Sequence, residues 1–417
     1  MMEAISYHKE NLNILKFFAL LGIVLMNVEF FYTPLEAVGW GVVATPHWLA
    51  KVVHIFVHGK FWTIFSLVFG STLFWAVRRG MTQEQKKASI ISLGVLGILH
   101  STLWAGDILF AYAMAASLLF LIINQKIAKI SFLCIGIAIL GMWLQYSSFG
   151  WILVGIICGV GCLYLGLYKK DMLVPSLAFW AFTPALMIAA SLGGIIDPAN
   201  EIVLEAKKIY QTQAEALQTL SFWDNFWMNF SIFFSKIFEQ SFQILSILGV
   251  MGIGWVFAEK QIWERSTSWF LKHALWGFPL TLLGVLLAPP FEGDQAKFSL
   301  YQGFFEIGRL GVALFWVGIV WSFVRSSKWA DAKKHMARVG ANSLSVYLTQ
   351  TLLGVFLFQF LLRNETINYP FALVIGLGIF AASVFLVFAL TRTKTRGPFE
   401  LLRKKIALHF LAKQQKK

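Results

Sequence analysis

Residues 99–109 read LHSTLWAGDIL, and they separate two apolar runs at 88–104 and 108–123. Each run is a candidate membrane helix, because the hydrocarbon core of a bilayer takes about 20 apolar residues to cross. The Ala105-Gly106 pair interrupts the helical pattern between the two runs. The stretch therefore predicts two helices joined at a turn that carries His100 and Asp107.

The composition extends this interpretation to the whole chain. The 417 residues are 58% hydrophobic and only 13% charged, which excludes an ordinary soluble globule. Helices satisfy their own backbone hydrogen bonds in hydrocarbon, so repeated apolar runs favour a helical membrane protein. We predict an all-α, polytopic transmembrane helical bundle of about 10–12 spans, forming a single integral membrane domain over residues 1–417.

The predicted spans follow the hydropathy of the chain. They cover residues 12–31, 61–77, 88–104, 108–123, 130–147, 150–167, 174–193, 241–258, 269–288, 304–324, 343–362 and 371–390. No cleavage site of the A-x-A kind follows the first run, so we do not expect a cleaved signal peptide. Two outward segments (33–60 and 195–240) and a basic tail (392–417) complete the organisation.

The formal charge of +14 indicates topology rather than nucleic-acid binding, because the basic residues fall in alternate connections between the spans. The same rule predicts that both termini are cytoplasmic and that the turn between His100 and Asp107 faces outward. The three cysteines, Cys134, Cys158 and Cys162, all lie in apolar runs. They indicate neither a disulfide framework nor a zinc site.

The outward segments contain aromatic residues suited to the headgroup level of a membrane. Segment 33–60 is expected to be partly helical, and 195–240 is expected to hold an amphipathic helix followed by an aromatic run. The second segment is either a helix that shields the bundle or a lid over a substrate. We find no phosphate-binding loop and no metal motif, and we predict no metal.

Ionisable side chains inside apolar spans are costly, so each is a functional candidate. On the predicted outer side we select as candidates Asn27, Glu29, His54, His58, Lys60, His100, Asp107, Glu306 and Arg309. His54 and His58 share a face if that segment is helical, and Glu306 and Arg309 have the spacing of an ion pair. We expect these groups to converge.

His100 and Asp107 are the strongest catalytic candidates, because a carboxylate that bonds one ring nitrogen of a histidine fixes its tautomer. Two structural alternatives remain. Asp107 follows Gly106 at the start of a helix, where it would also serve as an N-cap. His100 could instead be an interfacial residue bonded to a carbonyl group.

On the cytoplasmic side, polar residues recur at helical spacing after residue 340. The positions of Asn342, Tyr347 and Gln350 suit either hydrogen bonds to neighbouring helices or the lining of a cavity. The basic run 325–338 before them is expected to bind anionic lipid or a phosphorylated carrier such as coenzyme A.

Several motifs resemble those of the YeiB-like family of bacterial integral membrane proteins, domain of unknown function 418. The elements are Gly59-Lys60-Phe61 with Phe65-Ser66-Leu67-Val68-Phe69-Gly70, His100 through Trp104 to Gly106-Asp107-Ile108-Leu109 with Tyr112, Asn342-Ser343-Leu344 with Tyr347-Leu348 and Gln350, and Arg396-Gly397-Pro398-Phe399-Glu400. They occur in the expected order along nearly the whole chain.

The family is distantly similar to membrane acyltransferases of the heparan glucosaminide acetyltransferase type. This resemblance implies transfer of an acyl group from cytoplasmic acyl-CoA to an extracytoplasmic sugar or lipid in the bacterial inner membrane. It also implies a histidine at the outer entry of the second span as the base. For this activity we select as catalytic candidates His100, Asp107, His58 and His54. The binding candidates are Asn27, Glu29, Lys60, Tyr112, Glu306, Arg309, Asn342, Tyr347 and Gln350. The first span departs from these relatives, with L-N-I-L-K-F at residues 12–17 in place of L-D-x-L-R-G.

The sequence leaves a second class of function open. A secondary transporter or exporter also fits a chain with intramembrane His, Glu and Asp residues and both termini on one side. A membrane scaffold without chemistry is a third class. The expected partners are membrane lipid and a small-molecule or glycan acceptor, with no nucleic acid, and self-association stays open.

Overall fold

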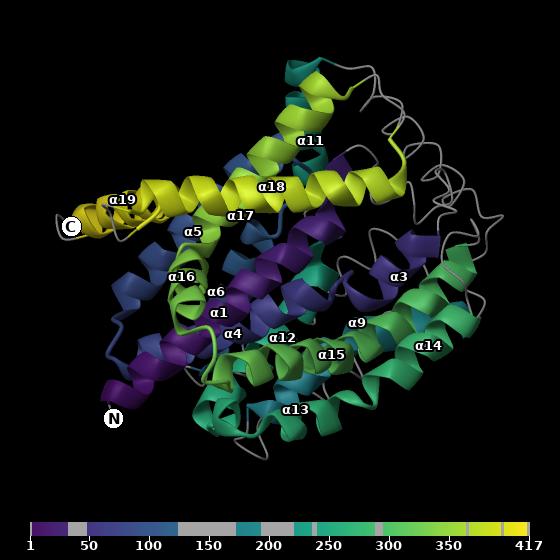
Figure 1. Cartoon of the computed structure of the whole chain (residues 1–417), viewed down its shortest axis with the longest axis horizontal. Coiled ribbons are helices and arrows are strands. Elements are labelled where there is room, and N and C mark those ends of the chain that lie inside the picture. The colour runs from purple at the N-terminus through teal and green to yellow at the C-terminus, as the bar shows by residue number, and fades with distance from the viewer. Residues whose placement is uncertain are drawn as a thin grey trace. The chain divides into compact units, whose positions relative to one another are not determined.

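The structure is a computed structural model that describes residues 2–31, 48–123, 172–192, 221–235, 240–287, 295–363, 367–392 and 396–414 (Figure 1). Every regular element in these ranges is a helix, which confirms the all-α prediction. The chain divides into two compact units. Unit 1 comprises residues 1–65, 187–229 and 265–402, and unit 2 comprises residues 66–186, 230–264 and 403–417.

Unit 1 contains the N-terminal helix and most of the C-terminal half of the chain. Its helices are α1 (Met2–Asn27), η1 (Glu29–Phe31), α3 (Trp48–Phe56), α13 (Thr267–Ala274), α14 (Gly277–Leu287), α15 (Gln295–Arg325), α16 (Ala330–Ala341), α17 (Ser343–Phe356), the π-helical turn η3 (Leu357–Leu361) and α18 (Tyr369–Leu390). It also holds the first residues of α4 (Lys60–Arg78) and α19 (Pro398–Gln414).

Within unit 1, α1 packs against α15, α16, α17 and α18, while α15 packs along α13 and α14. A buried lysine, Lys333, caps the C-terminal end of α15. Lys333 Nζ donates to the carbonyl oxygens of Val324 (3.1 Å) and Ser326, and Lys333 is only 9% exposed. A cation suits this position because the last carbonyl groups of a helix lack internal partners and carry partial negative charge.

Unit 2 is built on a hairpin of α5 (Gln83–Leu103) and α6 (Leu109–Ile123), with α12 (Gln240–Glu259) packed on α6. It also contains most of α4 and α9 (Leu173–Leu192), the end of α11 (Phe222–Ser235) and η2 (Ile262–Glu264). A capping box begins α5, because Thr82 accepts from Gln85 N–H and the Gln85 side chain accepts from Thr82 N–H.

Small residues bring α4 and α12 together in unit 2. A side chain at Gly70 would collide with the backbone of Met251, so only glycine permits this approach. Ser71 Oγ donates across the contact to the carbonyl oxygen of Gly254 (2.6 Å), and Trp263 Nε1 donates to Ser71 Oγ (2.8 Å). Small residues with a few hydrogen bonds between helices are typical of packing in membranes.

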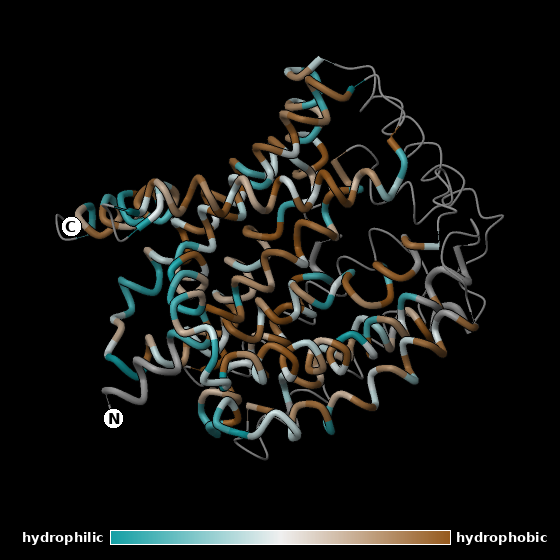
Figure 2. Tube along the Cα trace, in the orientation of Figure 1, coloured by the Kyte–Doolittle hydropathy of each residue, from teal (hydrophilic) through white to brown (hydrophobic). Residues whose placement is uncertain are grey.

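Five helical segments in the described part of the chain are long and apolar enough to cross a membrane: 10–27, 52–78, 302–325, 343–361 and 369–390. Two shorter apolar helices cover 109–123 and 243–259. Apolar residues run along most of these helices, and hydrophilic residues gather on α16 (Figure 2). These features support the predicted helical membrane protein.

One predicted span is wrong as a continuous helix. Residues 269–288 divide into α13 and α14, with a break at Leu275 and Trp276. Pro279 in the first turn of α14 explains the break, because proline has no N–H to bond the preceding turn and its ring clashes with it. The predicted spans 130–147 and 150–167, the three cysteines, and segments 33–47 and 195–220 lie outside the described residues.

Candidate functional site

The turn between α5 and α6 in unit 2 has the form predicted from residues 99–109. His100 lies in the last turn of α5, which ends where Trp104 adopts an extended conformation and its N–H donates to the His100 carbonyl oxygen (3.1 Å). Residues 105 and 106 form the turn, and α6 begins at Leu109. We call this segment, residues 100–110, the α5–α6 corner.

Within the corner, His100 Nδ1 lies 2.6 Å from Asp107 Oδ1. The two side chains are only 2% and 3% exposed, so water does not compete with this contact. When Nδ1 carries the proton that Asp107 accepts, the opposite ring nitrogen Nε2 is left with a lone pair. This arrangement can accept a proton from a bound hydroxyl or amine, because the carboxylate stabilises the imidazolium that forms.

Asp107 also caps α6. Its Oδ1 accepts from the N–H of Leu109 (3.1 Å) and its Oδ2 from the N–H of Phe110 (3.0 Å). These backbone groups have no partner inside the helix, so a carboxylate at this position stabilises the helix start. The two alternatives for Asp107 are therefore both realised in one side chain, which caps a helix and orients His100.

Tyr112 lies one turn further along α6 and contacts α4 within unit 2. Its hydroxyl is 2.8 Å from Ser66 Oγ in a buried hydrogen bond, and its ring lies edge-on to Phe69 with centroids 5.7 Å apart. These contacts connect two of the motifs in which the family resemblance was recognised. Tyr112 thus has a packing role, and its predicted role in substrate binding stays a prediction.

A second group of candidates gathers in unit 1 where α3 turns into α4. Gly59 makes this turn with φ of 79°, in the left-handed region that favours glycine. A Cβ at Gly59 would stand 2.7 Å from Arg309 Cδ, so the turn and α15 are closely packed. We use the name Lys60–Arg309 cluster for His54, His58, Lys60, Glu306 and Arg309.

The two histidines of the cluster stack on each other, with ring centroids 4.7 Å apart. The expectation of a shared helical face needs correction, because α3 ends at Phe56 and His58 lies in the turn. Phe305 of α15 stacks on His54 at 4.9 Å, and Phe30 of η1 meets the edge of His58 at 5.9 Å. Aromatic rings therefore contact both histidines.

The two cations of the cluster are buried, and the Glu306 side chain is 19% exposed. Lys60 is 0% exposed, and its Nζ lies 3.5 Å from the centroid of the Phe305 ring and 3.2 Å from the His54 carbonyl oxygen. Arg309 is 1% exposed, lies over the Trp62 ring at 3.9 Å and forms the predicted ion pair with Glu306. The i, i+3 spacing of the pair therefore gave a correct prediction of contact.

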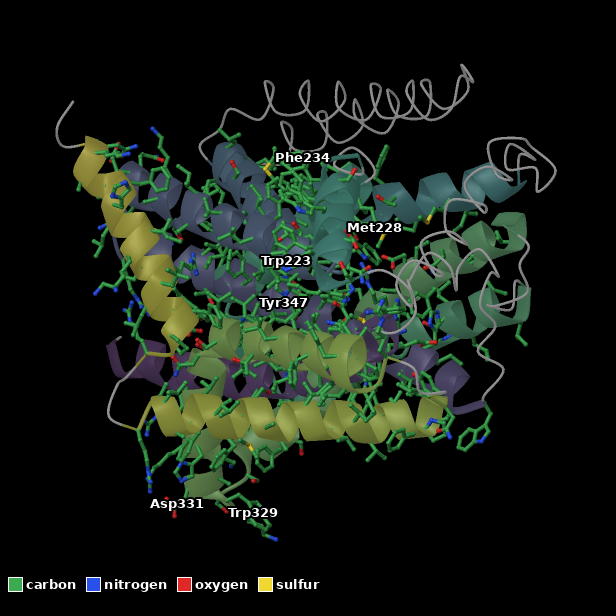
Figure 3. The ribbon with its side chains drawn as sticks, turned by 90° about the horizontal axis from the view of Figure 1, so that it is seen from above. Trp223, Met228, Phe234, Trp329, Asp331 and Tyr347 are labelled. Carbon is green, nitrogen blue, oxygen red and sulfur yellow. The ribbon has the colours of Figure 1, made fainter. Side chains whose placement is uncertain are left out.

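The candidates predicted for the cytoplasmic side lie at the start of α17 and along it in unit 1, where Tyr347 is labelled in Figure 3. Asn342 Oδ1 accepts from Gly397 N–H (2.7 Å), and Ser345 bonds Glu400 through both its N–H (3.0 Å) and its hydroxyl. Gln350 donates to the Leu20 carbonyl oxygen (3.4 Å), and Tyr347 is buried. Of the two alternatives for this polar stripe, the described contacts favour bonds between helices.

The remaining candidates, Asn27 and Glu29, are buried at the end of α1 and in η1 of unit 1. The corner belongs to unit 2 and the other candidates, apart from Tyr112, to unit 1, so their convergence stays a prediction. Among the described residues, no three His, Cys, Asp or Glu side chains are placed to hold a metal ion.

Sequence reasoning missed the aromatic and hydroxyl partners of these candidates. Phe305 and Trp62 cover the cluster cations, and Ser66 and Ser345 bond Tyr112 and Glu400. Ser66 lies inside a motif that carries the family resemblance, so its importance could have been inferred from the sequence. No sequence pattern marks Phe305, because its position over Lys60 depends on the packing of α15 against the start of α4.

Comparison with known proteins finds a similarity to one family in the C-terminal part of the chain. Residues 250–409 match the family described as "Protein of unknown function (DUF418)". A stretch of 102 residues is 35% identical to the uncharacterized protein YeiB of Escherichia coli (strain K12), and it covers 23% of this chain and 26% of YeiB. No solved structure gives a significant match. These residues are therefore similar to the YeiB-like DUF418 family, in line with the resemblance of the motifs, and the matched stretch spans about a quarter of YeiB.

Proposed function

We propose that this membrane protein is an acyltransferase in which His100 is the general base and Asp107 orients it. The observation that carries the proposal is the 2.6 Å contact between His100 Nδ1 and Asp107 Oδ1 in a buried corner. The family motifs and the distant similarity to membrane acyltransferases add support for this chemistry.

The proposed reaction needs one base and one thioester. His100 Nε2 takes the proton of an acceptor hydroxyl or amine, whose oxygen or nitrogen then bonds to the acyl carbonyl carbon. The thioester C–S bond breaks as the tetrahedral intermediate collapses, and the departing thiolate receives the proton from the imidazolium. Asp107 stabilises the imidazolium between the two proton transfers.

The donor proposed for this reaction is acyl-CoA from the cytoplasm, and the acceptor is a sugar or lipid outside the bacterial inner membrane. The distribution of basic residues supports the prediction that both termini are cytoplasmic. The basic residues between α15 and α17, Arg325, Lys328, Lys334 and Arg338, provide positive charge for the CoA phosphates. The proposal requires no metal.

The experiment uses everted membrane vesicles that contain the full chain, so that added radiolabelled acetyl-CoA reaches the cytoplasmic face. Label in the lipid and glycan fractions is compared between the wild type, His100→Gln and Asp107→Asn. Loss of a general base is expected to lower transfer by about 10²- to 10⁴-fold. His273→Gln is the control, because His273 is exposed and stacks on Trp269.

Equal labelling by His100→Gln and the wild type, at equal amounts of folded protein, would reject His100 as the base. A second function, transport, is favoured by the buried charges of the Lys60–Arg309 cluster inside predicted spans. Counterflow of a solute in proteoliposomes, without any labelled covalent product, would show that the protein is a transporter and not an acyltransferase.

A further inference from the structure

The C-terminal helix α19 has no residue in the core of the protein. None of its 17 residues is buried, and two of its apolar side chains are exposed, Leu402 at 40% and Leu408 at 52%. Single exposed leucines are common on protein surfaces, so they do not identify a partner by themselves. The charges beside them carry the argument further.

Positive charge dominates this helix. Its basic residues are Arg403, Lys404, Lys405 and Lys413, and its one acidic residue is Glu400, which accepts hydrogen bonds from α17. The three lysines are exposed, and an exposed ammonium group is charged at neutral pH. The surface of α19 is therefore strongly cationic.

The exposed lysines and leucines share one half of the helix. With about 3.6 residues per turn, Lys404, Lys405 and Lys413 fall on the same half as Leu402 and Leu408. The other half is half-buried and holds Phe399, Arg403, Ile406 and Phe410. A helix face that combines lysines with leucines suits the headgroup level of a membrane, where long side chains bury their apolar stems and keep their charge in water.

Contacts in unit 1 place the start of α19 at the end of two membrane spans. Gly397, just before the helix, donates its N–H to Asn342 Oδ1 (2.7 Å). Asn342 directly precedes the span 343–361, and α19 begins soon after the span 369–390 ends. The start of α19 therefore lies near the level of the lipid headgroups.

A contact in unit 2 gives the same level independently. Arg403 Nη2 donates to Ser89 Oγ (2.6 Å) and to the Ser89 carbonyl oxygen (3.3 Å). Ser89 lies within the first two turns of α5, at the beginning of the predicted span 88–104. Lys404 and Lys405 follow Arg403 directly, so their ammonium groups are within reach of the headgroups.

We propose that α19 binds the anionic phospholipid headgroups of the bilayer that the protein spans. Lys404, Lys405 and Lys413 attract the lipid phosphates, while Leu402 and Leu408 contact the boundary between headgroups and acyl chains. The predicted cytoplasmic location of the C-terminus fits this partner, because the cytoplasmic leaflet carries anionic lipid. This role goes beyond the proposed acyl transfer and does not depend on it.

The test uses the full-length protein in lipid nanodiscs. One set of discs contains phosphatidylcholine alone, and in the other phosphatidylglycerol replaces part of it. Hydrogen–deuterium exchange is followed by mass spectrometry in peptides from residues 398–414. Exchange of α19 is expected to be about tenfold or more slower with phosphatidylglycerol. Salt at about 1 M, where the Debye length is about 3 Å, is expected to remove most of this difference.

Two triple variants separate charge from helix structure. Replacement of Lys404, Lys405 and Lys413 by Gln is expected to abolish the difference between the two lipids. Replacement of the same three residues by Arg is the matched control, because it keeps the charge, and it is expected to retain the difference. The helix α12, which packs on α6 within unit 2, is the internal control and is expected to exchange equally in both discs.

Three results would overturn the proposal. Wild-type α19 could exchange equally in both lipids, which would show that anionic lipid does not hold it. The Gln variant could keep the full difference, or α12 could slow as much as α19, which would indicate a general effect of the bilayer. His100→Gln is expected to leave the result unchanged even where acyl transfer is lost, so the two proposals can fail separately.

Discussion

The α5–α6 corner and the Lys60–Arg309 cluster both bury ionisable side chains, but they stabilise them differently. In the corner, the Asp107 carboxylate meets His100 and two N–H groups of α6, all from one short segment of chain. In the cluster, Arg309 pairs with Glu306, and Lys60 and Arg309, which come from distant segments, lie against aromatic rings. The corner satisfies its charge locally, whereas the cluster depends on tertiary packing.

This difference indicates different kinds of site. A carboxylate whose oxygens are already occupied suits a fixed role, such as holding the tautomer of a base. A buried guanidinium is costly to leave without its carboxylate, because it stays away from water. The contrast predicts that charge removal destabilises the cluster more than the corner, and the following variants test it in order of expected effect.

Glu306→Gln is expected to have the largest effect on stability. It removes the carboxylate that pairs with the buried Arg309, and breaking a buried ion pair from one side costs about 3–5 kcal/mol of unfolding free energy. Unfolding in mixed detergent, followed by circular dichroism, measures this loss. Asp331→Asn is the control, because the ion pair of Asp331 with Lys334 is exposed and contributes little. Equal stability of Glu306→Gln and the control would contradict the contrast.

Gly59→Ala is expected to cost about 2 kcal/mol, since the left-handed conformation penalises a Cβ by about 1–2 kcal/mol and Arg309 must also move. Gly80→Ala is the matched control. Gly80 has φ of 84°, but a Cβ there meets no atom within 4 Å. The difference between the two variants, measured by the same unfolding assay, isolates the contact with Arg309. Equal losses of unfolding free energy in the two variants would show that the contact with Arg309 does not disfavour a Cβ at Gly59.

Asp107→Ala and Asp107→Asn separate the two roles of Asp107. Alanine removes the helix cap and is expected to cost about 1 kcal/mol, whereas asparagine is nearly as good a cap as aspartate. Both variants lack the carboxylate that stabilises the His100 imidazolium, so both are expected to lose acyl transfer. If Asp107→Asn retained full transfer, the cap would be the sole role of this side chain.

Ser66→Ala and Tyr112→Phe are expected to have the smallest effects. Their hydrogen bond joins α4 and α6, and buried bonds of this kind between membrane helices contribute about 0.6 kcal/mol on average. A double-mutant cycle in the unfolding assay measures the coupling free energy. A coupling free energy of zero would show that the packing of Tyr112 against Phe69, and not this hydrogen bond, stabilises the contact between α4 and α6.

The sequence predicted those parts of the molecule that depend on nearby residues. The helix break at Gly106, the His100–Asp107 contact and the Glu306–Arg309 pair each involve side chains within two helical turns, so their spacing carries the geometry. The ring of Phe305 over Lys60 and the bond from Ser345 to Glu400 join segments far apart in the chain. The spacing of residues along the sequence does not predict such contacts. The break before Pro279 was predictable, but averaged hydropathy hides a single proline in an apolar run.

The bonds between the start of α17 and the start of α19 have a consequence for topology mapping. Gly397 N–H donates to Asn342, and Glu400 accepts from Ser345, so the beginnings of these two helices lie within hydrogen-bond distance. Two segments this close share one face of the bilayer. A reporter enzyme fused behind residue 417 would therefore report the location of Asn342 as well, and a single fusion would orient both segments.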